Sequence, residues 1–118
     1  MLWLLLLPTA FAEESAWPAR DPAQPIVGRW EEYSANSVID FFPDGTLHAY
    51  SPVAGATGRW RIDQNSILTL TMLVQGEQLT FQGKAAFIGE EEMEWALDEE
   101  GTVKHRRFEQ PLPPGFRP

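Results

Sequence analysis

The chain has 118 residues, of which 43% are hydrophobic, and this length supports one domain with one core but not two. Seventeen Asp and Glu residues against nine Lys and Arg give a formal net charge of −8, which repels nucleic acid and anionic membrane surfaces. The absence of cysteine excludes disulfides, thiolate chemistry and a lipid-attachment cysteine.

The chain begins with an apolar run, MLWLLLLPTAFA, that ends in the small-x-small pattern cut by signal peptidases, although no basic residue precedes it. This run is too short to cross a bilayer as a helix, which takes about 20 residues. We therefore predict a signal peptide over residues 1–12, cleaved after Ala12, and a periplasmic or secreted protein without a membrane span. Prolines predict an extended arm over residues 13–25 and a similar tail over residues 110–118, because proline cannot donate a backbone hydrogen bond.

Residues 26–109 consist of short segments in which apolar and polar residues alternate, separated by turn dipeptides such as Asp44-Gly45. Short connections make each segment pair with the next in an antiparallel meander, and eight twisted strands hide both edges by closing on themselves. We predict an all-β fold, an eight-stranded antiparallel up-and-down barrel, with a two-sheet sandwich as the alternative. The expected strands cover residues 26–34, 37–42, 46–51, 58–63, 67–74, 78–88, 92–98 and 102–109.

The triplet Gly-Arg-Trp occurs twice, at residues 28–30 and 58–60, each time near the start of an expected strand. With an intervening Phe and Asp-Gly-Thr and a following Leu-x-Leu, this order resembles the short lipocalin-like domains of bacterial secreted proteins. The resemblance implies that the first Trp packs under an Arg of the last strand. The long helix that follows the barrel in full-length lipocalins has no counterpart here. The residues that carry the pattern are Gly28, Trp30, Phe41, Asp44, Gly45, Thr46, Gly58, Trp60, Leu68 and Leu70.

Strand alternation places Gly28 and Trp30 on one face of the first strand. The missing side chain of Gly28 leaves room for a bulky neighbour, and Trp30 can close one end of the barrel. On the last strand, Val103 and Arg107 share a face, and the apolar Val103 indicates that this face points inward. We therefore prefer Arg107 as the cation over Trp30 and keep Arg106 as the alternative.

The residues that could support catalysis or bind a metal are scattered along the sequence. His48 and His105 lie on separate expected strands without metal-ligand spacing, and the arginines that follow His105 lower its proton affinity. The serines lack an accompanying His and carboxylate, and there is no Gly-rich phosphate loop. We predict no enzyme activity, no catalytic residue, no metal site and no cofactor.

The interior of an eight-stranded barrel is either filled by side chains or able to hold one small ligand, and both outcomes stay open here. We predict a secreted, non-enzymatic monomer that binds a small apolar ligand in the barrel, with Trp60, Trp95, Phe81 and Met72 as its wall. The alternative is a protein-interaction or enzyme-inhibitor module that acts through the barrel rim or the N-terminal arm, where Trp17 would anchor a protein partner.

Overall fold

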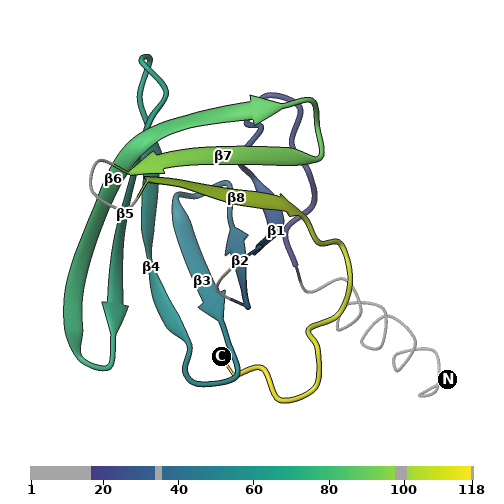
Figure 1. Cartoon of the computed structure of the whole chain (residues 1–118), viewed down its shortest axis with the longest axis vertical. Coiled ribbons are helices and arrows are strands. Elements are labelled where there is room, and N and C mark those ends of the chain that lie inside the picture. The colour runs from purple at the N-terminus through teal and green to yellow at the C-terminus, as the bar shows by residue number, and fades with distance from the viewer. Residues whose placement is uncertain (1–16, 34–35, 98–100, 118) are drawn as a thin grey trace, which may run out of the picture.

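The protein is described here by a computed structural model, which covers residues 17–33, 36–97 and 101–117; the predicted signal peptide and residues 13–16 of the predicted arm lie outside the described residues. Eight antiparallel strands follow one another around a closed barrel, in which β1 pairs with β8 (Figure 1). The predicted up-and-down barrel is confirmed, and the two-sheet sandwich is wrong. The strands are β1 (Gly28–Glu32), β2 (Ser37–Phe41), β3 (Thr46–Tyr50), β4 (Ala56–Ile62), β5 (Ile67–Val74), β6 (Glu77–Ile88), β7 (Glu92–Leu97) and β8 (Gly101–Arg107).

The strand boundaries follow local turn chemistry. Between β2 and β3, Gly45 adopts a positive φ of 89°, and the Oδ1 atom of Asp44 accepts hydrogen bonds from both the backbone N–H (2.9 Å) and the hydroxyl (2.6 Å) of Thr46. Several strand ends differ from the prediction by one or two residues. For example, β4 begins two residues early, because Ala56 and Thr57 already pair with β3. Within the described residues, no helix has the length and apolar character to cross a membrane.

One end of the barrel is packed solid. We call it the closed end; β1 begins there and β8 ends there. Every second residue of each strand points inward, and at this end the inward side chains are large and almost fully buried. Two more apolar residues come from the segment just before β1. The cluster at the closed end contains Ile26, Val27, Trp30, Phe41, Leu47, Trp60, Leu68 and Met93.

The described part of the N-terminal arm covers the closed end. Arg20 donates hydrogen bonds to Glu91 in the β6–β7 turn (2.5 and 3.0 Å) and to Glu109 after β8 (2.7 and 3.0 Å). Pro18 is buried and Trp17 is half-buried, with the guanidinium carbon of Arg29 5.1 Å from its ring centroid. From Trp17 onward, therefore, the arm is part of the packed structure and does not present an exposed Trp.

The outer face of β1 and β2 carries a buried ion pair beneath the arm and the tail. Arg29 and Asp40, whose Cα atoms are paired across the two strands, are 4% and 1% exposed. Arg29 donates to both carboxylate oxygens of Asp40 (2.7 and 2.8 Å) and to the backbone carbonyl of Gln110 in the tail (2.9 Å). Farther along, the tail returns to the residue that follows β3, where the N–H of Arg117 donates to the carbonyl of Ser51 (2.9 Å). Both extended segments are thus attached to the barrel by specific contacts.

Candidate ligand-binding cavity

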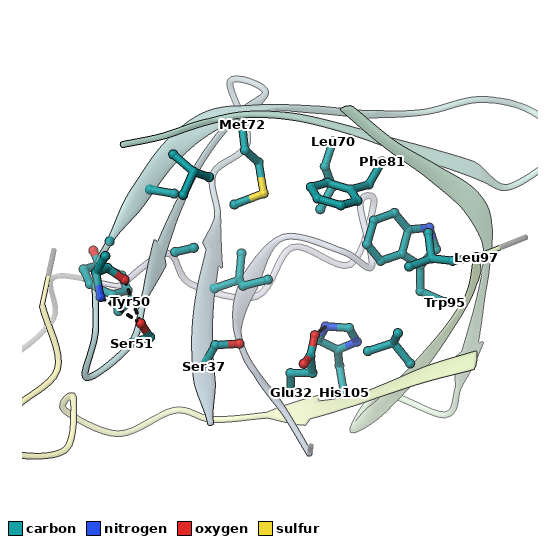
Figure 2. Close-up of a pocket in the computed structure, with 17 residues that line it drawn as sticks. Glu32, Ser37, Tyr50, Ser51, Leu70, Met72, Phe81, Trp95, Leu97 and His105 are labelled. Atoms are coloured by element: carbon teal, nitrogen blue, oxygen red, sulfur yellow. Dashed lines mark hydrogen bonds and ion pairs between the residues drawn. The ribbon is translucent and has the colours of Figure 1, made fainter. Parts of the chain in front are cut away.

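The other end of the barrel, which we call the open end, contains a cavity of about 350 Å³ (Figure 2). It lies where β1, β3, β5 and β7 end and where β2, β4, β6 and β8 begin. Its wall is mainly apolar, with a few polar side chains on one side. The large apolar side chains of the wall are Ile39, Leu70, Met72, Phe81, Trp95 and Leu97.

Three of the four predicted wall residues border this cavity. Met72, Phe81 and Trp95 come from β5, β6 and β7 and lie around it in Figure 2. The indole N–H of Trp95 donates to the backbone carbonyl of Gly83 (3.0 Å), which fixes the ring against the wall. These side chains are therefore held in place by the barrel itself.

Trp60, the fourth residue predicted for the wall, does not border this cavity. It lies in the second half of β4, toward the closed end, where its indole N–H donates to the carbonyl of Phe42 (2.9 Å). Its ring meets that of Phe41 edge-on, with centroids 6.3 Å apart. Trp60 faces inward as alternation requires, but its depth along the barrel axis places it in the packed core.

At the first Gly-Arg-Trp triplet, the neighbour accommodated by Gly28 is the guanidinium of Arg107. A Cβ at Gly28 would overlap this group, and the φ of +137° adds backbone strain for any other residue. Arg107 lies over Trp30, with its guanidinium carbon 4.1 Å from the ring centroid, and donates to the carbonyls of Val27 and Pro25 (2.7 Å each). Arg106 points outward and forms an ion pair with Glu31. The first triplet therefore anchors the closed end.

The second triplet has a different structural role. A Cβ at Gly58 would collide with the backbone carbonyl of Thr71 on β5, so this glycine permits close approach of two strands. Arg59 of the same triplet is exposed, whereas its counterpart Arg29 is buried. The first triplet thus helps to close one end of the barrel, whereas the second allows β4 and β5 to pack closely.

The polar side of the cavity is formed by residues that were not among the predicted wall residues. Glu32 of β1 and His105 of β8 are directly paired across the seam that closes the barrel, and both point into the cavity in Figure 2, near Ser37. The Nε2 atom of His105 is 3.9 Å from a carboxylate oxygen of Glu32. The alternation of side chains along a strand could have indicated both residues. Glu32 lies on the same inward face of β1 as Trp30, and His105 lies on the same inward face of β8 as Arg107.

Burial sets the protonation state of His105. Its side chain is only 2% exposed, and this burial lowers its pKa from 6.5 to about 4, while the carbonyl of Val103 opposes the shift. The direction agrees with the prediction, but the predicted cause was wrong, since neighbouring arginines do not produce the shift. His105 is therefore neutral at pH 7.

His105 binds protons more tightly in the unfolded chain than in the folded chain. The contribution of this residue to the free energy of unfolding is therefore fully present above pH 6.5 and is lost as the pH falls toward 4. We expect the free energy of unfolding to fall by about 2 kcal/mol between pH 7 and pH 5 through this residue alone. Urea unfolding followed by circular dichroism at both pH values measures the loss. The variant His105→Phe should lack this part of the pH dependence, and His48→Gln should retain it; equal slopes in both variants would contradict the assignment.

Comparisons of the chain with protein-family models, with curated proteins and with solved structures found no match. The likeness to lipocalin-like domains therefore stays a prediction based on the motifs. Among the residues that the structure describes, no three or more His, Asp or Glu side chains gather closely enough to hold a metal ion. The cavity is thus the feature with the clearest capacity for binding.

Proposed function

We propose that this chain is a secreted, non-enzymatic, lipocalin-like protein that binds one small apolar ligand in the cavity at the open end of its barrel. The observation that carries the proposal is the combination of a packed end with a hollow one. Ligand sites in proteins are concave, mainly apolar and roughly 300–1,000 Å³ in volume. The cavity has about 350 Å³ and a wall of aliphatic and aromatic side chains, which suits a ligand at the small end of this range.

The apolar wall supplies the affinity in this proposal. A ligand that contacts Met72, Phe81 and Trp95 removes apolar surface from water, at roughly 25 cal/mol per Å² before the costs of association. The packed closed end helps indirectly, because the rigid barrel keeps the wall in place without the ligand. Secretion is supported by the apolar run at residues 1–12, which lies outside the described residues.

The alternative, a protein-interaction module anchored by Trp17, has less support. An anchor residue must be available to its partner, and Trp17 is half-buried against Arg29. Binding through the arm would first require the arm to leave the barrel, with loss of the hydrogen bonds from Arg20 to Glu91 and Glu109. We therefore place the ligand-binding proposal first.

Filling the cavity should abolish binding. Ala49 borders the cavity, so Ala49→Phe places a ring in the space that the ligand would take. The fluorescent apolar probe N-phenyl-1-naphthylamine should bind the purified full chain, and the variant should bind it at least about tenfold more weakly. Fluorescence titration gives both dissociation constants.

The matched control is Ala86→Phe, which makes the same change at an exposed position of β6. It should bind the probe as the wild type does. Circular dichroism shows whether each variant is folded. Undetectable binding of the probe to the wild type, or equal binding by folded Ala49→Phe, would overturn the proposal.

A further inference from the structure

The apolar wall of the cavity differs in chemistry from one side to the other. On the side formed by β5, β6 and β7, a thioether and two aromatic rings border the cavity (Figure 2); they belong to Met72, Phe81 and Trp95. Across the barrel, β3, β4 and the loop between them contribute small side chains, among them Ala49, Ala54 and Ala56. The alanines leave the space that the sulfur and the rings border.

The two aromatic side chains lie along the inner face of β6. The Nε1 atom of Trp95 is 3.1 Å from the position that a Cβ of Gly83 would take, and it donates to the carbonyl of the same glycine (3.0 Å). The missing side chain of Gly83 therefore lets the indole lie against β6. Phe81 is two residues from Gly83 and shares its inward face.

The sulfur comes from the neighbouring strand. Phe81 pairs with Leu70 of β5, and Met72 is the next inward residue of that strand. Met72 is thus a diagonal neighbour of Phe81 across the β5–β6 pair, within reach of the same ligand. In Figure 2 its thioether lies at the cavity, as do the rings of Phe81 and Trp95.

This part of the wall distinguishes aromatic from saturated hydrocarbon. Aromatic rings in edge-to-face or offset contact attract one another beyond the effect of the area that they bury. A thioether sulfur makes a further favourable contact with a ring. A saturated ligand of the same size gains from burial of its area but from neither of these contacts.

We infer that the ligand carries an aromatic ring, which binds among the side chains of Met72, Phe81 and Trp95. The inference rests on the proposed ligand-binding function and adds the class of ligand. The ring lies against the β5–β7 side of the cavity, in the space that the alanines of β3 and β4 leave open.

Two alcohols with the same carbon skeleton test this assignment. Isothermal titration calorimetry of the purified full chain at pH 7 compares 2-naphthol with decahydro-2-naphthol, in which both rings are saturated. The two probes share their ten carbon atoms and their hydroxyl group. 2-Naphthol should bind about tenfold more tightly, because it alone makes ring–ring and sulfur–ring contacts.

Phe81→Leu should reduce this preference to about threefold or less, since leucine keeps an apolar side chain but has no ring. The matched control is Phe87→Leu, the same change on the same strand beside Trp30, where the residue does not border the cavity. This control should keep the preference. Circular dichroism shows whether each variant is folded.

Met72→Leu is a second test, because it replaces the sulfur at nearly unchanged volume. It should lower the preference for 2-naphthol about twofold. If Phe81→Leu fails to fold, this variant and the two affinities of the wild type decide the question.

Each contrary outcome has a definite meaning. Equal affinities of the wild type, or tighter binding of decahydro-2-naphthol, would overturn the ring inference and leave ligand binding standing. An undiminished preference in folded Phe81→Leu would assign the effect to the shape of the cavity, and equal losses in Phe81→Leu and Phe87→Leu would assign it to a general loosening of the barrel; both would overturn the inference. Binding of neither alcohol would also overturn it, and the titration with N-phenyl-1-naphthylamine would then decide separately whether the proposed function stands.

Discussion

Replacing Trp30 by alanine is expected to lower the free energy of unfolding by about 3–5 kcal/mol, the range for large aromatic side chains removed from a core. Trp30 is 1% exposed and sits beside Phe87, with ring centroids 6.4 Å apart. Its indole N–H donates to the carbonyl of Ile26 (2.8 Å), and Arg107 lies over its ring. The substitution would leave a void and remove both polar contacts at the closed end.

Urea unfolding followed by circular dichroism at pH 7 measures this effect. Val53→Ala provides the comparison, because Val53 is 82% exposed and its truncation should change the free energy by no more than about 0.5 kcal/mol. A loss below about 1 kcal/mol for Trp30→Ala would show that the closed end can collapse around the missing ring and would contradict its role as anchor.

Arg29→Met should cost about 3–5 kcal/mol, because it leaves the carboxylate of Asp40 buried without its partner. Asp40 is 1% exposed and receives two hydrogen bonds from Arg29. The double variant Arg29→Met with Asp40→Leu should regain most of the loss, since an apolar pair of similar volume has no charge to bury. Denaturant unfolding of the two single variants and the double variant gives the coupling energy.

Arg59→Met is the matched control, because Arg59 occupies the same place in the second Gly-Arg-Trp triplet and is exposed. This change should affect stability little. If both arginine variants lost the same free energy, the buried ion pair would have no special importance, and the difference between the two triplets would need another explanation.

The fold was predictable because alternation and turn dipeptides are local signals. The turn at Asp44-Gly45 and the alternation along β5 each identify a hairpin or a strand without reference to the rest of the chain. Closure followed from the number of strands and the absence of long connections. Alternation indicates whether a side chain lies on the inner or the outer face of the barrel.

Depth along the barrel axis was not predictable in the same way. Trp60 and Trp95 both face inward, yet one is in the packed core and the other borders the cavity. Their depth depends on the register of each strand against its neighbours, and that register is set by packing of the whole barrel. The pairing of Glu32 with His105 has the same origin, because it joins the first strand to the last.

The contacts that the arm and the tail make with the barrel were not predictable, for a different reason. Proline-rich segments have no periodic pattern, so their composition indicates extended chain without indicating what it covers. The contacts that hold them come from single side chains, such as Arg20 to Glu91 and Arg29 to the carbonyl of Gln110. Without those positions, Asp40 would be read as a solvent-facing residue of a half-exposed strand.

The seam between β1 and β8 has a consequence for how the molecule opens. It consists of three residue pairs, whereas β5 and β6 share eight, and it joins the most distant strands of the chain. Its closure carries the largest loop entropy, so we expect its amides to exchange with solvent before those of the longer strand pairs. Glu32 and His105 form one of the three pairs, and both border the cavity. A ligand in contact with both residues would therefore link β1 to β8. Ligand binding would then raise the free energy of opening the seam in proportion to the logarithm of ligand concentration over the dissociation constant.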